Sequence, residues 1–201
     1  MPGDVHRTRL RAECGANRAA IVAAAEAALR QRPFREVSVE ELMQHAGLAR
    51  TQFYRYFDDL ADLVLKVTQS VFEELLASHE ALVDMAEVSA ANLRLAIAPA
   101  VDAFAAHGPL VRALSEAAVH DSGVEQVFDG VQERYIALTE KLVSRAAATG
   151  APIADPTQTA RLLHMGNVAY LIDTFGREPK VKPAVALDTV VGAWCAVLAV
   201  R

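Results

Sequence analysis

Apolar residues recur every three or four positions along most of this chain, which is the spacing of one face of an α-helix. The pattern is clearest in one long run, whose repeating apolar positions are Leu60, Leu63, Val64, Val67, Val71 and Leu75. No segment shows the bounded alternation of β-branched and polar residues that predicts a β-strand. The sequence therefore predicts an all-α fold.

Glycine, proline and N-capping residues divide this pattern into helices of different length. Short helices are expected at about 17–31, 39–46 and 49–56, and a long helix begins at residue 60 and lasts to about residue 85. The later stops are Gly108-Pro109, Ser122-Gly123, Gly150-Ala151-Pro152 and the loop 176–183, and Asp155-Pro156 is a strong helix start. These divisions predict nine helices, three in a small head and six in a larger body.

Charge is distributed unevenly along the 201 residues. The net charge of −5 disfavours binding to a polyanion such as DNA. Residues 1–57, however, hold nine Lys and Arg against six Asp and Glu, whereas residues 58–201 hold eleven against nineteen. All nine of the first group are arginine, whose planar fork suits phosphates and guanine edges. The asymmetry supports DNA binding only slightly, because arginine richness also follows from a GC-rich genome.

Residues 38–57, SVEELMQHAGLARTQFYRYF, have the proportions of a helix-turn-helix unit. Ser38 and Glu41 form a capping box that starts the first helix, and Gly47 stands where a left-handed C-cap is needed. Small residues at the turn let the two helices approach each other. The exposed face of the second helix is then free to enter a major groove of DNA.

This motif, with its closing run Phe53-Tyr54-Arg55-Tyr56-Phe57, resembles the head of the TetR family of transcriptional regulators. The body is similar to the ethionamide-resistance repressor branch, through stretches such as 135–139 and 187–194. The resemblance implies a flexible basic arm over residues 1–16, a helix-turn-helix DNA-binding domain over 17–60, and an effector-binding and dimerisation domain over 61–201. It also implies that DNA is met by Ser38, Arg50, Thr51, Gln52, Tyr54, Arg55 and Tyr56.

Two departures from the family pattern weaken the expected contact with DNA. Ala49 replaces the Ser or Thr that usually caps the recognition helix, a cap worth about 1 kcal/mol. Leu60 replaces a lysine that would lie beside a phosphate. The alternating Arg7, Arg9 and Arg11 could compensate by following a minor groove, although a disordered tail is the favoured interpretation.

The resemblance implies that the body dimerises through its last two helices, which places two recognition helices about 34 Å apart, or wider with spread heads, on an inverted-repeat operator. The expected interface residues are Leu162, Leu163, Val190, Val191 and Val197. The expected effector-binding residues are Leu93, Phe104, Phe128, Tyr135, His164, Asn167 and Trp194. Each of these aromatic or polar residues could instead belong to an ordinary core. We also expect Pro99 to kink its helix and open room beside it.

Arg94, Arg112 and Arg161 are expected to face solvent, which leaves no cation for an acidic effector. We therefore expect a small, neutral, apolar effector that binds a mostly apolar pocket and releases the operator. No cofactor or metal site is expected. The alternative is a dimeric helical module that binds a small molecule or a protein and has little affinity for DNA.

Enzymatic activity is not expected, because the chain lacks metal-binding, nucleophile-elbow and phosphate-loop motifs. His120-Asp121 and Glu116 lie close together, but a histidine and an aspartate at a helix boundary usually cap and solvate that boundary. No segment resembles a membrane helix or a signal peptide, so a cytoplasmic protein is expected.

Overall fold

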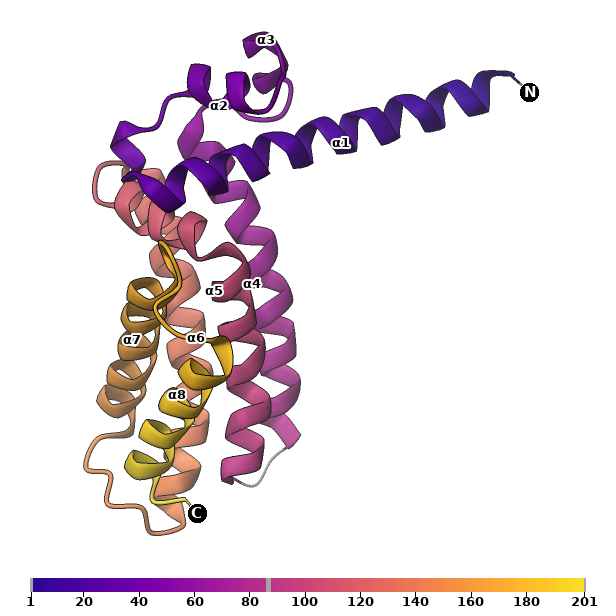
Figure 1. The fold of residues 1–201 in the computed structure, drawn as a ribbon. Helices are drawn as coiled ribbons and strands as arrows, with labels where there is room; N and C mark the ends of the chain where they lie inside the picture. Colours follow the sequence, from indigo (N-terminus) through magenta and orange to yellow (C-terminus); the bar gives the residue numbers. More distant parts are fainter. Residues whose placement is uncertain (1, 86–87, 201) are drawn as a thin grey trace.

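The computed structural model describes the backbone of residues 2–85 and 88–200, and the side chains of these residues except 2–14, 74, 77–79 and 81–85. Over this part the chain forms eight α-helices, one short 3₁₀ helix and no strand, which confirms the all-α prediction (Figure 1). The elements are α1 (Pro2–Gln31), η1 (Phe34–Glu36), α2 (Val39–His45), α3 (Arg50–Phe53), α4 (Leu60–Met85), α5 (Ala90–Ala118), α6 (Ser122–Ala148), α7 (Pro156–Phe175) and α8 (Pro183–Leu198).

The head consists of α1 to α3 and the first turns of α4, built around two aromatic side chains. Phe53 and Phe57 are buried with ring centroids 5.5 Å apart. The predicted capping box is present, since the Ser38 hydroxyl accepts from the Glu41 N–H while the Glu41 carboxylate accepts from the Ser38 N–H. Gly47 has a φ of 66°, the left-handed conformation expected after α2.

Two helices of the head differ in length from the prediction. The first helix begins at Pro2 rather than at residue 17, so the expected arm is helical from residue 2 onward. The side chains of Arg7, Arg9 and Arg11 lie outside the described residues. The recognition helix α3 ends at Phe53 rather than near residue 56, because the next turn is tighter: Tyr56 N–H donates to the Phe53 carbonyl, three residues back, at 2.9 Å.

The body is a bundle of α4 to α8 in which α5 is the central helix. It contacts α4, α6, α7 and α8 as well as α1 and η1. Most side chains in its second half are buried, including Leu110, Val111 and Leu114. Among the described residues, no helix is long and apolar enough to cross a membrane.

The prediction of nine helices was wrong within the described chain, because Gly108-Pro109 does not end a helix. Helix α5 continues through both Pro99 and Pro109, so the body has five helices instead of six. Gly108 has a different role: a Cβ at this position would lie 2.4 Å from the Phe175 carbonyl oxygen. Glycine here permits the end of α7 to approach α5 closely.

Arg112 was expected to face solvent, but its side chain is 8% exposed between the head and the body. The guanidinium donates to the carbonyls of Leu29 and Arg32 at the end of α1, and Nε donates to the Gly176 carbonyl after α7 at 2.8 Å. It also pairs with Glu116. By contrast, the exposed Arg94 pairs with Asp188, in accordance with the expectation.

Candidate functional site

The first candidate surface is the outer face of α3 at the end of the head. Arg50, Thr51, Tyr54 and Arg55 are exposed there, whereas Phe53 between them is buried. This division follows from the period of a helical turn, which directs one side chain into the head and its neighbours away from it. Four of the seven residues expected to meet DNA therefore form one exposed surface.

Arg50 and Tyr54 contact each other on this surface. Arg50 Nη2 donates to the Tyr54 hydroxyl at 3.3 Å, and the guanidinium carbon lies 6.0 Å from the centre of the tyrosine ring. The hydrogen bond with Tyr54 raises the pKa of Arg50, and an arginine is charged at physiological pH in any case. The pair presents a cation and an aromatic ring to the solvent side by side.

The other three expected residues have local structural roles. Gln52 is half-buried, and its Oε1 accepts from the Ala49 N–H at 3.0 Å. This bond is the reciprocal half of a capping box; the other half, an acceptor for an N–H of the first turn, is missing because Ala49 has no side-chain oxygen. Tyr56 is half-buried with its ring 6.3 Å from that of Phe57, and Ser38 belongs to the capping box of α2.

Leu60, which stands where a lysine was expected to contact DNA, is buried in the hydrophobic core. A nearby lysine on the same helix, Lys66, pairs with Asp62 at 2.8 Å. The apolar Leu60 side chain therefore joins α4 to the head instead of reaching toward DNA.

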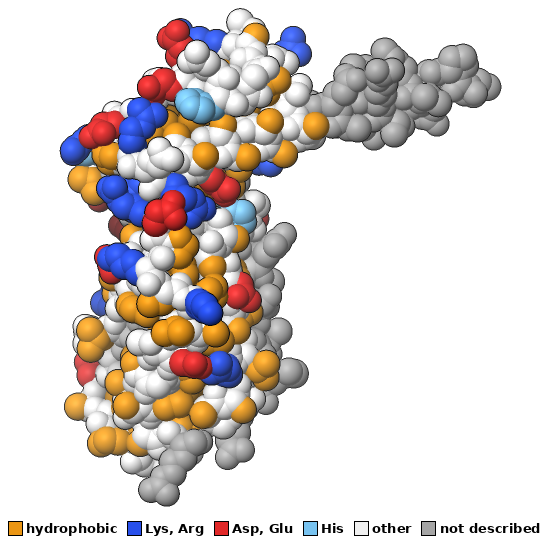
Figure 2. All heavy atoms as spheres, in the orientation of Figure 1, with side chains coloured by type: hydrophobic (Ala, Val, Ile, Leu, Met, Phe, Trp, Pro, Cys, Tyr) orange, Lys and Arg blue, Asp and Glu red, His pale blue; other side chains and the backbone are white. Residues whose placement is uncertain are grey.

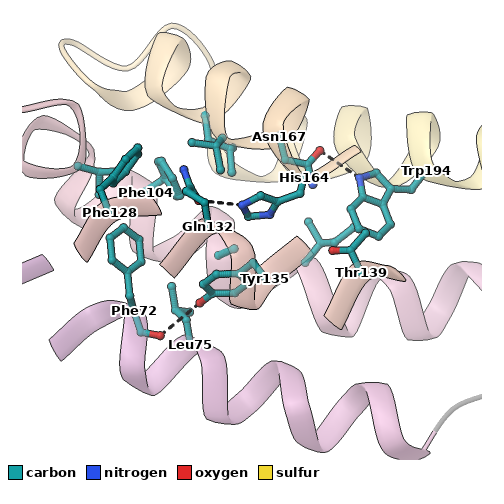
Figure 3. Close-up of a pocket in the computed structure, with 15 residues that line it drawn as sticks. Phe72, Leu75, Phe104, Phe128, Gln132, Tyr135, Thr139, His164, Asn167 and Trp194 are labelled. Carbon is teal, nitrogen blue, oxygen red and sulfur yellow. Dashed lines mark hydrogen bonds between the residues drawn. The ribbon is translucent and has the colours of Figure 1, made fainter. Parts of the chain in front are cut away.

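The second candidate site is a cavity of about 60 Å³ inside the body (Figure 3). It brings together six of the seven residues expected to bind an effector: Phe104, Phe128, Tyr135, His164, Asn167 and Trp194. The seventh, Leu93, is buried near the start of α5 and is not among the lining residues. The lining also includes Phe72, Leu75, Ile97, Ala100, Val111, Gln132, Thr139, Val168 and Leu171.

Helical spacing could have identified several of these additional residues. On α6, Phe128, Gln132, Tyr135 and Thr139 follow one another at intervals of four, three and four residues, which places them along one helix face. The signal for Gln132 is an amide inside this otherwise mostly apolar or aromatic stripe. For Phe72 the sequence offered only its position on the long α4 as an indication that it could line the cavity.

Most polar side chains of the cavity form hydrogen bonds within its lining. His164 Nε2 lies 2.8 Å from Gln132 Oε1, and the His164 ring stacks on Tyr135 with centroids 5.5 Å apart. Trp194 Nε1 donates to Asn167 Oδ1 at 3.0 Å, and the Tyr135 hydroxyl donates to the Phe72 carbonyl at 3.3 Å. Burial raises the pKa of Tyr135, so its hydroxyl remains neutral.

The composition of the lining determines what the cavity can accept. Among the described residues that line it, none is Asp, Glu, Lys or Arg. Burying an unpaired charge in such surroundings costs several kcal/mol, whereas an apolar group gains about 25 cal/mol for each Å² that it buries. The cavity therefore favours a neutral, largely apolar ligand with a few hydrogen-bonding groups.

The residues expected at the dimer interface fall into two groups. Leu162 is 72% exposed and Val197 is also exposed, so both side chains face away from the protomer. Leu163, Val190 and Val191 are buried within the protomer and offer little surface to a second copy, so their assignment to the interface stays a prediction. The neighbouring residue on a helix points about 100° away, so Leu162 and Leu163 cannot share a face.

Two members of the group His120, Asp121 and Glu116 have structural roles. Asp121 is the N-cap of α6 and accepts from the N–H groups of Gly123 and Val124. Glu116 accepts from the Phe34 N–H and pairs with Arg112. Among the described residues, no group of three or more His, Cys, Asp or Glu side chains could hold a metal ion.

Comparison with known families gives two matches that together span the head and the body. Residues 21–67 match the bacterial regulatory proteins of the TetR family, and residues 93–198 match the C-terminal domain of the transcriptional regulator EthR. The HTH-type transcriptional regulator EthR of Mycobacterium tuberculosis (strain ATCC 25618 / H37Rv) is 29% identical over 180 residues, which cover 87% of this chain and 83% of EthR.

Solved structures share the fold at lower identity. PfmR from Thermus thermophilus, a TetR family regulator, has a TM-score of 0.73 and 16% identity, covering 90% of this chain and 97% of its own. AibR in complex with isovaleryl coenzyme A and operator DNA has a TM-score of 0.68 and 17% identity, covering 88% and 97%. FadR from Bacillus subtilis in complex with stearoyl-CoA has a TM-score of 0.65 and 14% identity, covering 90% and 98%.

Proposed function

Because this chain belongs to the TetR family of transcriptional regulators, in the EthR branch, we propose that it is a repressor that binds an inverted-repeat operator as a homodimer and is released by a small lipophilic effector. The observation that carries the proposal is that one chain contains both a candidate DNA-binding surface and a candidate ligand cavity. A head exposes Arg50 and Tyr54 on α3, and the body encloses an apolar cavity. A repressor must reach the chromosome, so we propose that the protein acts in the cytoplasm of a bacterium.

The assignment of DNA contacts rests on exposure and chemistry. Arg50, Thr51, Tyr54 and Arg55 are the proposed contacts of α3, because their side chains face solvent. Arginine is the commonest specific partner of guanine. Gln52 and Ser38 remain proposed contacts through the atoms that capping does not use, and Tyr56 remains one through its half-exposed ring.

The proposed dimer interface is the face of α7 and α8 that the protomer leaves uncovered. Hydrophobic side chains gather over these two helices in Figure 2, and the large exposed ones are Leu162, Met165, Val185 and Val197. A second copy of the chain would cover them. Gly166 and Gly192 lie on the same helices with open space beside them, which would allow close approach of a partner helix.

The proposed effector is neutral and mostly apolar, in agreement with the uncharged lining of the cavity. AibR and FadR are bound to acyl-coenzyme A esters in their structures, which makes molecules with an acyl chain a reasonable first class to test. The effector would release DNA only if it binds more tightly to the state in which the two heads do not fit the operator.

The test is a fluorescence-polarisation titration of the protein with its own upstream intergenic DNA and with a scrambled duplex, at two salt concentrations. We expect tight binding to the native duplex, with an affinity that falls as salt rises because arginines displace counterions from phosphates. Equal and weak binding to several upstream duplexes and to the scrambled one would contradict the proposal. That outcome would favour the alternative, a dimeric small-molecule or protein-binding module, which the acidic body and the buried Leu60 already suit.

A further inference from the structure

Phe72, on α4, separates two hollows in the body. Its side chain lines the inner cavity together with Phe104 and Phe128, and the three rings gather at one end of that cavity in Figure 3. The same residue lines a groove of about 250 Å³ between α4 and α6, whose other lining residues are Gln69, Glu73, Leu76, Val127, Gly130, Val131 and Arg134. Phe72 is 9% exposed and lies where the groove and the cavity adjoin.

The inner cavity is too small for an effector in the observed conformation. It measures about 60 Å³, whereas an engineered apolar cavity that binds benzene measures ~150 Å³. A ligand of that size or larger therefore requires side chains of the lining to move. Among the described residues, Phe72 is the only side chain that lines both the cavity and the neighbouring groove.

The segment of α4 before Phe72 has features that ease its displacement. The Thr68 hydroxyl donates to the Val64 carbonyl at 2.7 Å, and the Ser70 hydroxyl donates to the Val67 carbonyl at 2.9 Å. Such bonds compete with the backbone ladder and often bend a helix. The Phe72 carbonyl accepts from the Tyr135 hydroxyl at 3.3 Å, a long hydrogen bond that connects this turn to the polar group around His164.

We propose that Phe72 is the gate of the effector cavity, and that an elongated effector enters from the groove between α4 and α6. Its apolar chain would pass Phe72 into the cavity, and its polar end would lie in the groove beside Gln69, Glu73 and Arg134. This inference rests on the proposed function of the cavity. It adds the route and the shape of the ligand, an amphiphile rather than a compact apolar molecule.

The fluorescence of Trp194 provides a test that needs no knowledge of the effector. This is the single tryptophan of the chain, and it lines the cavity. Acrylamide is a small neutral quencher that must reach the indole to act. We expect Phe72→Ala to raise the bimolecular quenching rate by about threefold or more, because opening no longer requires a ring to move. The matched control Phe104→Ala also removes a cavity ring, but Phe104 does not line the groove, so this change should alter the rate little.

A second variant tests the groove by adding a ring to it instead of removing one. A Cβ at Gly130 meets nothing within 4 Å, so Gly130→Phe adds a ring to the groove without disturbing the fold. We expect it to reduce the quenching rate in the otherwise unchanged protein by roughly half or more, because access by local opening is blocked. Asp129→Phe places the same ring on the exposed side of α6 outside the groove and serves as the control.

Two results would overturn the proposal. One is an unchanged quenching rate in Gly130→Phe, which would exclude the groove as the route even if Phe72→Ala failed to fold. The other is an equal increase in Phe72→Ala and Phe104→Ala, which would make Phe72 a filler of the cavity only. Neither measurement involves DNA, so a failure of the gate is distinguishable from a failure of the repressor proposal.

Discussion

The contact between Arg50 and Tyr54 restricts the side-chain conformations of two candidate DNA-binding residues. A guanidinium that donates to a tyrosine hydroxyl 3.3 Å away gives up rotamer freedom before it meets DNA. Fewer rotamers are then lost on binding, which favours affinity. The remaining N–H groups of Arg50 are sufficient for a bidentate contact with a guanine or a phosphate.

Arg50→Ala should lower the affinity for the operator about 10- to 100-fold, which corresponds to ~1–3 kcal/mol. The loss should occur without a change in helicity or dimer mass, since the side chain is exposed. Fluorescence polarisation with the operator duplex measures it. Arg35→Ala, an exposed arginine in η1, is the matched control. Equal effects of both changes would mean that only the overall charge of the head matters.

The start of α3 should gain stability from a better cap. Ala49 has the extended backbone of an N-cap residue, but only the reciprocal bond from Gln52 is present. Ala49→Ser should raise the free energy of unfolding by about 0.5–1 kcal/mol, because the hydroxyl can accept from an N–H in the first turn. Urea denaturation with an unchanged m-value measures this. Ser38→Ala removes the existing cap of α2 and should lower the free energy of unfolding. A lower free energy of unfolding in Ala49→Ser as well would show that residue 49 does not have the geometry of an N-cap.

At the scale of a helix, two glycines inside long helices have opposite physical roles. Both Gly108 and Gly130 lie inside long helices, where glycine costs roughly 0.5–1 kcal/mol relative to alanine. The space beside them differs: a Cβ at Gly108 would be 2.4 Å from the Phe175 carbonyl oxygen, whereas a Cβ at Gly130 meets nothing within 4 Å. At Gly108 the steric clash with the Phe175 carbonyl therefore outweighs the gain in helix propensity that alanine would bring.

Gly108→Ala should destabilise the protein by about 2 kcal/mol or more, because the end of α7 must move away from α5. Gly130→Ala should instead stabilise it by ~0.5–1 kcal/mol through helix propensity. Thermal or urea unfolding of the two variants side by side measures the difference. Stabilisation by both would mean that α5 and α7 do not approach as closely as the structure has it.

The ends of a helix could be predicted where the signals are local in sequence, and not where they depend on distant contacts. Helix α7 was predicted at 156–175 and lies there, since the signals at both of its ends, Asp155-Pro156 and Gly176, are local. The stop at Gly108-Pro109 failed because the requirement for glycine comes from Phe175, a residue distant in sequence. Pro109 is tolerated inside α5, where tertiary packing outweighs local propensity.

At the scale of the whole molecule, the candidate sites were predictable where they depend on one helix face. His164 and Asn167 lie one turn apart on α7, and both line the cavity. Phe104 and Trp194, on α5 and α8, were expected from the family resemblance instead. Phe72 was missed because its position in the wall depends on how α4 lies against α6. The burial of Leu163 and Arg112 was missed for the same reason, since the side of a helix that faces the core depends on its neighbours.

The head and the body are joined by a small polar cluster as well as by α4. Arg112 donates to the end of α1 through the carbonyls of Leu29 and Arg32, and to the end of α7 through that of Gly176. Its partner Glu116 accepts from the Phe34 N–H. Burial lowers the pKa of Arg112, but an arginine retains its charge, so the cluster remains intact over the physiological pH range.

Arg112→Met should therefore lower the free energy of unfolding by about 3 kcal/mol, because it leaves Glu116 without a cationic partner and three carbonyls without their donor. It should also speed amide hydrogen exchange over residues 29–34, where α1 meets the body. Urea denaturation and exchange mass spectrometry measure the two effects. Arg94→Met breaks an exposed ion pair with Asp188 and should cost less than ~1 kcal/mol without faster exchange at α1. If both variants behaved alike, Arg112 would not tie the head to the body, and α4 would be left as the mechanical link through which an effector in the cavity acts on the DNA-binding surface.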